Sequence, residues 1–506
     1  IHSLLTIKIL LQKLTFFVRN LSTVFLIHDK NRQGIFIAYL HLFYKSFNNT
    51  QPTVSFAQEA GLAPSWSRVK DSHYSRCTEA SDPNECLVLD IHVPTSTNHP
   101  WPVYAWVAGG SGEYYPRDLV RKDIIVVTVH HRLGPQGFLC LGVEKAPGNA
   151  GVKDVVLALR WIRDNIVAFK GNPSRVVVGG QGLGAAMVEA LMLSRMSREL
   201  FYGAILQSGT AFSPWAFHYD SENRSKTLLN MLSESGNVMS LLDANNSDVS
   251  HRSEILQFPY FPFGMCVEKP FKKEEMLLSE SPHTLISKNQ IMDVPTIIGY
   301  NSNEAYIFIT NLINNNILKV AIEDISPLLP EELKLNERQR RHIGKQIHDV
   351  YFRNNVTMFT LLHYYRDAYF LNHIYRSMVH HAQHHPVYFY EFSHSSPIGI
   401  EPEMGFNKIG AAHSDELVYL FPEKGRNFDN DDQIVKEHLI DMWSNFVKYL
   451  TPTRNTSGPY WQAVDLNTPR VFIIDIEPST KEFTQINAMQ IWNDIYTKYY
   501  FNANEK

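Results

Sequence analysis

The chain has 506 residues, of which 44% are hydrophobic and 19% charged, a composition typical of a globular protein with a large buried core. Its formal net charge of −4 gives no reason to expect binding to nucleic acid or to an anionic membrane. Among the 22 scattered histidines the densest group is HAQHH at residues 381–385, for which we expect a solvated helix end or a loop. We expect no bound metal and no cofactor.

Residues 1–50 are predicted to be a poorly defined N-terminal leader or extension. Charged residues, among them Lys8, Arg19 and Arg32, interrupt its apolar segments, so none approaches the ~20 apolar residues of a membrane helix. The stretch GIFIAYLHLF at residues 34–43 is too short to cross a membrane, and no clear cleavage pattern follows it. The C-terminal FNANEK also lacks an apolar span, so we expect no transmembrane segment in this chain.

Regular secondary structure is predicted from about residue 65 onward. Strands are expected at residues 87–93, 103–108, 124–131, 175–180, 202–209, 294–300, 387–392 and 471–476, and helices at residues 149–169 and 185–196. The alternation of strands and helices indicates a mostly parallel sheet flanked by helices, as in the α/β class. Because no repeat or linker divides this part of the chain, we predict one large α/β domain over residues 51–500.

The stretch VVVGGQGLGAAM at residues 176–187 is typical of a strand, a glycine-rich turn and the start of a helix. In many hydrolases this turn carries the pattern G-x-S-x-G, with the catalytic serine at its apex. Here the apex residue is Gly182, which has no side chain and cannot form an acyl-enzyme. Glycine adopts the strained backbone of such a turn freely, so this residue favours the fold while it removes the nucleophile.

Several further segments follow one another in a characteristic order. They are NECLVLDIHVP (84–94), HHRLGPQGFL and APGNAGVKDVVLALRWIRDNIVAFKGNPSRV (within 130–176), ILQSGTAFSPWA (205–216), VYFYEFSH (387–394) and GAAHSDELVYLF (410–421). In this order they resemble the type-B carboxylesterases and cholinesterases of the α/β-hydrolase fold, from about residue 60 to about residue 480. The resemblance implies that fold and a carboxylic ester hydrolase activity, although the family's PPVGxLRF segment is not recognisable here.

The resemblance also implies the positions of a catalytic acid and a catalytic base. Glu304, within GYNSNEAYIF, stands at the family's acid position, and His413, within GAAHSDEL, stands at its histidine position. In these roles the two side chains should lie within hydrogen-bond reach of each other. The alternatives are an exposed loop glutamate and a loop histidine bonded to nearby backbone. The nucleophile position of the same triad falls on Gly182.

The family's oxyanion loop reads H-G-G-G or a close variant, whereas this chain reads A-G-G-S at residues 108–111. The implied backbone donors are Gly110, Ser111 and Leu183. Leu183 replaces a smaller residue of the family and is expected to crowd the pocket. Ser111 is one candidate for a substitute nucleophile. Ser208, on the strand after the glycine turn, is expected to be a buried hydroxyl bonded to nearby backbone.

The four cysteines include Cys77 and Cys86, which flank a short polar loop and would correspond to the family's first disulfide. Cys140 follows the apolar GFL and is expected to be buried. Glycosylation sequons occur at Asn48, Asn223, Asn245, Asn355 and Asn455. A disulfide and several sequons together favour a secreted or cell-surface location.

Three functions are compatible with a hydrolase frame that lacks its serine. The first is a non-catalytic extracellular binding or adhesion protein with a protein partner or a homodimer, similar to the family's neuroligin, neurotactin, gliotactin and glutactin branch. The second is an active ester hydrolase that uses another nucleophile, or a chain whose residue 182 is a sequence error. The third is a carrier that holds a hydrophobic small molecule in the gorge of the fold. We expect the first.

Overall fold

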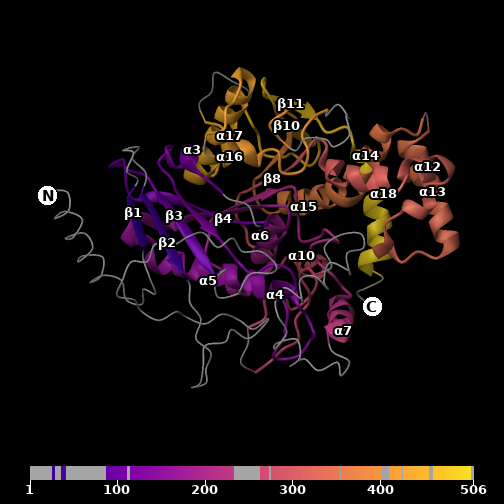
Figure 1. Cartoon of the computed structure of the whole chain (residues 1–506), viewed down its shortest axis with the longest axis horizontal. Helices are drawn as coiled ribbons and strands as arrows, with labels where there is room; N and C mark the ends of the chain where they lie inside the picture. The colour runs from indigo at the N-terminus through magenta and orange to yellow at the C-terminus, as the bar shows by residue number, and fades with distance from the viewer. Residues whose placement is uncertain are drawn as a thin grey trace.

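The computed structural model describes residues 25–28, 36–41, 87–110, 114–232, 263–272, 275–353, 355–399, 409–423, 425–454 and 460–502 of the chain. In the first two ranges it describes the backbone strands alone. The described residues form one large sheet with helices on both faces (Figure 1). This arrangement confirms the predicted α/β class with a mostly parallel sheet flanked by helices.

Eleven strands build the sheet of the described residues, in the spatial order β1-β2-β3-β5-β4-β6-β7-β8-β9-β10-β11. They are β1 (Phe25–His28), β2 (Phe36–His41), β3 (Val88–Val93), β4 (Trp101–Val107), β5 (Ile125–Val129), β6 (Gly171–Gln181), β7 (Gly203–Gln207), β8 (Thr296–Asn301), β9 (Val387–Phe392), β10 (Arg470–Ile474) and β11 (Ser479–Glu482). All neighbours between β5 and β10 in this order run parallel, and the pairs at the two edges run antiparallel. Each strand predicted from the sequence is present.

The helices of the described residues cover the two faces of the sheet unequally (Figure 1). On one face pack α3 (Arg117–Val120), α16 (Leu417–Leu420) and α17 (Asn430–Tyr449). The core on the other face includes residues of α4 (Gly134–Phe138), α5 (Ala150–Asn165), α6 (Leu183–Leu193), α7 (Ser221–Leu232), α10 (Pro282–Ser287), α11 (Ile309–Asn314), α12 (Ile317–Glu323), α13 (Glu337–Tyr351), α14 (Met358–Arg366), α15 (Asn372–Ala382) and α18 (Ile486–Tyr496).

Strand β4 illustrates why the sequences of the central strands are apolar at every position. Val103, Ala105 and Val107 contribute to the core under α5 and α6. Tyr104 and Trp106 contribute to the core under α17. Successive side chains of a strand point to opposite faces, so a strand covered on both faces needs apolar residues at every position.

Two strands lie within residues 1–50, which the sequence analysis interprets as a leader or extension. β2 pairs antiparallel with β3 along its whole length, and β1 pairs with β2. The stretch GIFIAYLHLF therefore provides a strand of the sheet. In the part of the chain that the structure describes, no helix is both long and apolar enough to span a bilayer.

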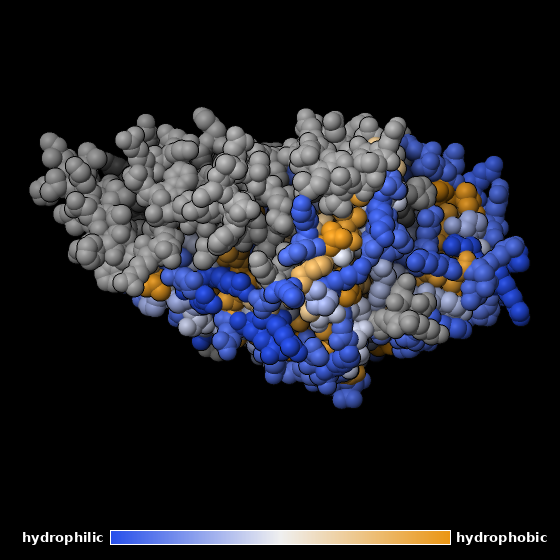
Figure 2. Space-filling view, turned by 90° about the horizontal axis from the view of Figure 1, so that it is seen from below, coloured by the Kyte–Doolittle hydropathy of each residue, from blue (hydrophilic) through white to orange (hydrophobic). Residues whose placement is uncertain are grey.

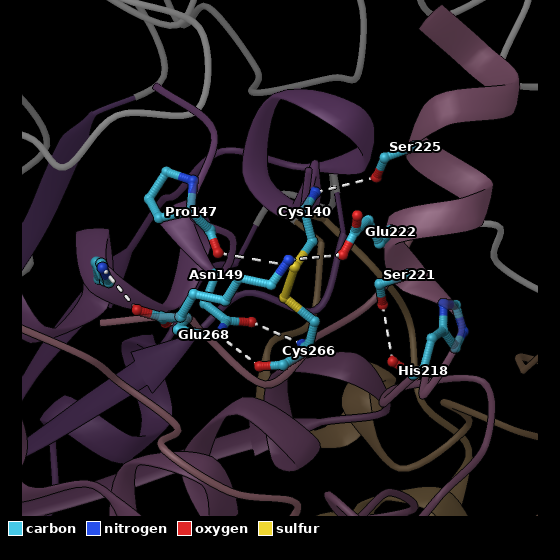
Figure 3. Close-up of a disulfide and its surroundings, with 11 residues drawn as sticks. Cys140, Pro147, Asn149, His218, Ser221, Glu222, Ser225, Cys266 and Glu268 are labelled. Carbon is cyan, nitrogen blue, oxygen red and sulfur yellow. Dashed lines mark hydrogen bonds and ion pairs between the residues drawn. A yellow bond between two sulfur atoms is a disulfide. The ribbon is translucent and has the colours of Figure 1, made fainter. Parts of the chain in front are cut away.

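A disulfide that the sequence analysis did not predict joins Cys140 to Cys266 (Figure 3). The predicted burial of Cys140 is confirmed. The bridge connects positions 126 residues apart and ties the loop after α4 to the segment before α10. Beside it, Asn149 donates to the carbonyl of Cys266 at 2.9 Å and accepts from its N–H at 2.9 Å. The other expected pair, Cys77 and Cys86, lies outside the described residues.

The histidine group at residues 381–385 lies at the end of α15, as predicted, and Gln383 and His384 are exposed there, whereas His381 and His385 are buried, so the prediction of a solvated group holds only in part. His381, in the last turn of α15, has a fully buried side chain whose Nε2 lies 2.9 Å from Oε1 of Glu189 on α6. Its Nδ1 lies 3.0 Å from Nε2 of His385. These contacts brace α15 against α6, which spacing along the sequence does not reveal. Within the described residues no group of His, Cys, Asp and Glu is arranged to hold a metal ion.

Two of the five predicted glycosylation sites fall on described residues. Asn223 on α7 and Asn355 before α14 are both exposed, as a modified asparagine has to be. Asn48, Asn245 and Asn455 lie outside the described residues.

Candidate active site

The turn between β6 and α6 has the geometry of a nucleophile elbow. β6 ends at Gln181 and α6 begins at Leu183, so Gly182 alone forms the bend, with φ 57° and ψ −120°. Its N–H donates to the carbonyl of Gln207 at 2.8 Å, and its carbonyl accepts from the N–H of Ala186 at 3.1 Å. A residue with a β-carbon is strained in this conformation, whereas glycine is not. The predicted nucleophile position is therefore the apex of the turn.

Close packing holds this turn and requires glycine on both sides of the apex. A β-carbon on Gly184 would lie 2.5 Å from the carbonyl oxygen of Val107, and one on Gly180 would lie 2.5 Å from the carbonyl carbon of Gly184. The apex itself is open. Apart from its chain neighbours, a β-carbon on Gly182 would meet only the ring of His413 among described atoms within 4 Å, at 3.2 Å from Nε2.

Glu304 and His413 lie within hydrogen-bond reach of each other, as the sequence predicts. Oε2 of Glu304 is 2.5 Å from Nδ1 of His413. Glu304 follows β8 in a short 3-10 helix and is fully buried, so it is not an exposed loop glutamate. The loop that carries His413 is joined to the end of β8 by a bridge between Asn303 and Ala412. The pair lies near Gly182, which His413 alone approaches, because β6 and β8 are parallel and end at the same edge of the sheet.

A second buried carboxylate, Glu416, lies behind this pair and was not singled out from the sequence. Its Oε1 accepts from the side-chain amide of Gln207 at 3.0 Å, and its Oε2 accepts from that of Asn301 at 2.6 Å. The backbone N–H of Asn301 also donates to Glu304 at 2.7 Å. Burial raises the pKa of Glu416 to about 7, and the charge of Glu304 adds to this effect. Its position three residues after His413 in the GAAHSDEL motif could have indicated a role in the site, but only the fold shows that Glu416 is buried.

The surroundings of His413 favour its charged form. Burial lowers the pKa of the imidazole, but the charge and hydrogen bond of Glu304 outweigh burial and raise the pKa above the ordinary 6.5. The carboxylates of Glu416 and Asp415 act in the same direction.

The side chain of Gln181 occupies the other edge of the imidazole. Its amide nitrogen lies 2.9 Å from Nε2 of His413. In the neutral ring Nδ1–H donates to Glu304, and Nε2 then accepts from the Gln181 amide. Gln181 therefore holds the atom to which a serine hydroxyl would donate in a complete triad.

A cavity of about 250 Å³ opens over Gly182. Its apolar and aromatic wall consists of Tyr114, Trp215, Ile307, Phe308, Phe370 and Leu417. Gly110 and Leu183, two of the predicted oxyanion positions, also line it, whereas Ser111 lies outside the described residues. Leu183 thus reaches the pocket as predicted, and a cavity remains beside it.

Ser208, which the sequence predicts to be a buried hydroxyl, is not among the described residues that line this pocket. It follows β7, is fully buried and has a positive φ of 56°. Its hydroxyl has no hydrogen-bond partner among the described residues, so the predicted bond to nearby backbone is wrong.

An elbow, an acid–base pair and a pocket at the carboxyl edge of a mostly parallel sheet define a protein of the α/β-hydrolase class. The sequence model of the protein family described as "Carboxylesterase family" matches residues 48–492 of this chain. The chain therefore belongs to this family. The predicted family membership is confirmed.

Similar proteins include Pyrethroid hydrolase Ces2e of Rattus norvegicus, which is 29% identical over 494 residues that cover 84% of this chain and 80% of that protein. Juvenile hormone esterase of Heliothis virescens is 27% identical over 431 residues, covering 78% of this chain and 76% of that protein. The crystal structure of juvenile hormone esterase from Manduca sexta, with OTFP covalently attached, matches with a TM-score of 0.80 at 24% identity, over 94% of this chain and 100% of that chain. The structural likeness confirms the fold. Likeness to the adhesion branch stays a prediction.

Proposed function

We propose that the chain is a non-hydrolytic member of the carboxylesterase family that binds a small molecule, with its apolar part against the aromatic wall, in the cavity over Gly182. The open elbow carries the proposal: the apex has no side chain, and the base beside it is bonded to Gln181. Acyl transfer in this fold begins with attack by a side-chain oxygen at the apex. The site has a pocket and an acid–base pair, but the nucleophile of that reaction is missing.

Water is the remaining nucleophile that His413 can activate. A general base must accept a proton, and the atom that would do so, Nε2, already accepts from the Gln181 amide. The raised pKa of His413 also reduces the fraction of neutral imidazole near neutral pH. Both features argue against efficient hydrolysis by water.

From the sequence alone we expect an adhesion role with a protein partner or a homodimer. Among the described residues of the face shown in Figure 2, hydrophobic residues lie in small groups between hydrophilic ones, so this part of the surface offers no broad apolar docking area. A lined cavity with an apolar wall supports the small-molecule carrier instead. The secreted or cell-surface location is part of this proposal, and the exposed sequons at Asn223 and Asn355 are compatible with it.

Fluorophosphonate labelling of the purified chain, read by intact mass and peptide mapping, tests the proposal. These probes react with activated serines, so we expect no adduct and no turnover of p-nitrophenyl butyrate. An active esterase of the family is the positive control, and the His413→Ala variant identifies background reactions. A stoichiometric adduct, or turnover that disappears in His413→Ala, would show a working hydrolase and overturn the proposal. The mapped peptide would then name the nucleophile, with Ser111 as the first candidate.

A further inference from the structure

The open space at Gly182 is bounded by groups that attract negative charge. Nε2 of His413 lies 3.2 Å from the point where a β-carbon would stand. The 11-residue helix α6 begins at Leu183, whose N–H belongs to the first helical turn and has no intrahelical acceptor. Such helix starts carry partial positive charge. The oxyanion loop lies against this start, since a β-carbon on Gly184 would be 3.2 Å from the nitrogen of Gly109.

The acidic groups near His413 are engaged with other partners. Glu304 pairs with the ring at 2.5 Å, so the two together are close to neutral when the ring is protonated. Asp415 accepts the N–H of Ala412 at 2.7 Å. Glu416 is held protonated up to about pH 7 by its burial. No Lys or Arg is among the described residues that line the cavity, so the Nε2–H of protonated His413 is the charged hydrogen-bond donor that this lining offers to a ligand.

Away from these groups the cavity is apolar. Trp215, Phe308 and Phe370 line it, and the ring of Phe370 lies 5.1 Å from that of His413. The indole N–H of Trp215 donates to the carbonyl of Tyr369 at 2.8 Å, so its polar atom is already satisfied by the protein. The volume of about 250 Å³ is many times the ~10–15 Å³ that a cavity needs to hold one water molecule, so there is room for a ligand of several non-hydrogen atoms. This volume suits an alkyl chain of medium length.

We propose that this site binds a medium-chain carboxylic acid through its ionised carboxylate. One carboxylate oxygen lies in the space at Gly182 and accepts from Nε2–H of His413, the other faces the N–H of Leu183, and the alkyl chain lies against the aromatic wall. The inference rests on the proposed function, because the side chain of a serine at residue 182 would occupy the place of the carboxylate. An ester hydrolase releases a carboxylic acid, and this site would retain one.

A carboxylate fits this arrangement better than an ester or an amide. A protonated His413 cannot accept from the Gln181 amide, so the 2.9 Å contact between them gives way when the ring is charged. Both side chains can then donate to a carboxylate placed between them. Hydrogen bonds between charged groups are about twice as strong as neutral ones, so an uncharged ligand gains less from the same donors.

The test compares octanoate with octanamide, its uncharged isostere, by calorimetric titration of the full chain at about pH 6 and at a series of higher pH values, because the pKa of His413 is raised above the ordinary 6.5. We expect octanoate to bind about tenfold more tightly than octanamide at the lower pH. The preference should be lost as the pH rises through the raised pKa of His413, because the ring is then neutral, while Glu416 is charged above about pH 7 and octanoate stays ionised.

Two variants identify the histidine responsible. His413→Gln removes the charge and should abolish the preference at the lower pH, whereas His438→Gln, on α17 and not lining the cavity, should leave it unchanged. Equal binding of the two probes at the lower pH, no binding of either, or a preference that survives His413→Gln would overturn the inference. If His413→Gln does not fold, the change with pH in the preference of the unmodified chain for octanoate over octanamide tests the role of His413. Fluorophosphonate labelling does not depend on the binding of octanoate. An adduct would therefore overturn the proposed function, whereas a failed binding test without an adduct would overturn only the carboxylate inference.

Discussion

The two halves of the candidate site differ in what they retain. In the acid–base half the side chains are complete: Glu304 lies 2.5 Å from His413, and Asn301 links Glu304 to the buried Glu416. In the elbow half only the backbone is complete. Gly182 keeps the φ and ψ of the turn, but no side chain projects from it.

The difference follows from how each half is held. The elbow is held by backbone hydrogen bonds and by the close approach of Gly184 to Val107, and neither depends on a serine at the apex. The acid–base half is held by side chains that satisfy one another in the core. Loss of one partner there leaves a buried polar group without a hydrogen bond, which costs about 1–3 kcal/mol. Removal of the nucleophile is thus cheap for the fold, and removal of the acid–base pair is not.

The largest effect is expected when the elbow half is completed. Gly182→Ser places a hydroxyl beside Nε2 of His413 and should raise the hydrolysis of p-nitrophenyl butyrate on the order of a thousandfold. The double variant Gly182→Ser, His413→Ala should return to the natural rate, as measured in steady-state assays. A folded Gly182→Ser protein without a gain in rate would mean that the acid–base half is also unable to support catalysis.

The second prediction concerns pH and the network behind Glu304. The pKa of Glu416 rises from 4.5 to about 7 on folding, so its contribution to stability is fully present at acid pH and is lost as pH rises through about 7. The loss is roughly 3 kcal/mol for a shift of this size. Glu416→Gln should reduce the dependence of the unfolding free energy on pH, measured by urea denaturation. Glu482→Gln, at an exposed position of β11, is the control, and equal slopes in both variants would contradict the prediction.

The third prediction concerns the packing of the elbow. Gly184→Ala would place a β-carbon 2.5 Å from the carbonyl of Val107 and should destabilise the protein by about 2–3 kcal/mol in denaturant unfolding. Gly110→Ala is a matched glycine-to-alanine control in the neighbouring loop, because no described atom lies within 4 Å of its β-carbon position. If both variants unfold at the same denaturant concentration, close packing is not what holds the turn.

The smallest effect is expected at the apex itself. Gly182→Ala introduces backbone strain at φ 57°, and the added β-carbon contacts only His413 among the described atoms. We expect a loss of about 1–2 kcal/mol from strain alone, measured by thermal unfolding, without gain of esterase activity. A loss as large as that of Gly184→Ala would show that the apex is as tightly packed as its neighbours.

Much of the fold was predictable because the central strands are buried on both faces. Val103 to Val107 form an unbroken apolar run for this reason, and the same holds for Ile125 to Val129. The pairing of Glu304 with His413 was also expected, from the order of motifs along the chain. The features that the sequence did not predict depend on contacts between residues far apart in the chain. The Cys140–Cys266 bridge spans 126 residues, and no local pattern indicates it.

The sequence alone determined that residue 182 is a glycine without a side chain, because the identity of a residue does not depend on how the chain folds. It also determined the fold class, since apolar periodicity and glycine positions are local properties. Only the tertiary structure decided that Gln181 occupies Nε2 of His413 and that Glu416 is buried behind Glu304. Those relations join the end of β6, the turn after β8 and a loop more than one hundred residues further along the chain. They arise because parallel strands bring their carboxyl ends to one edge of the sheet, which is a property of the assembled sheet and of no single segment.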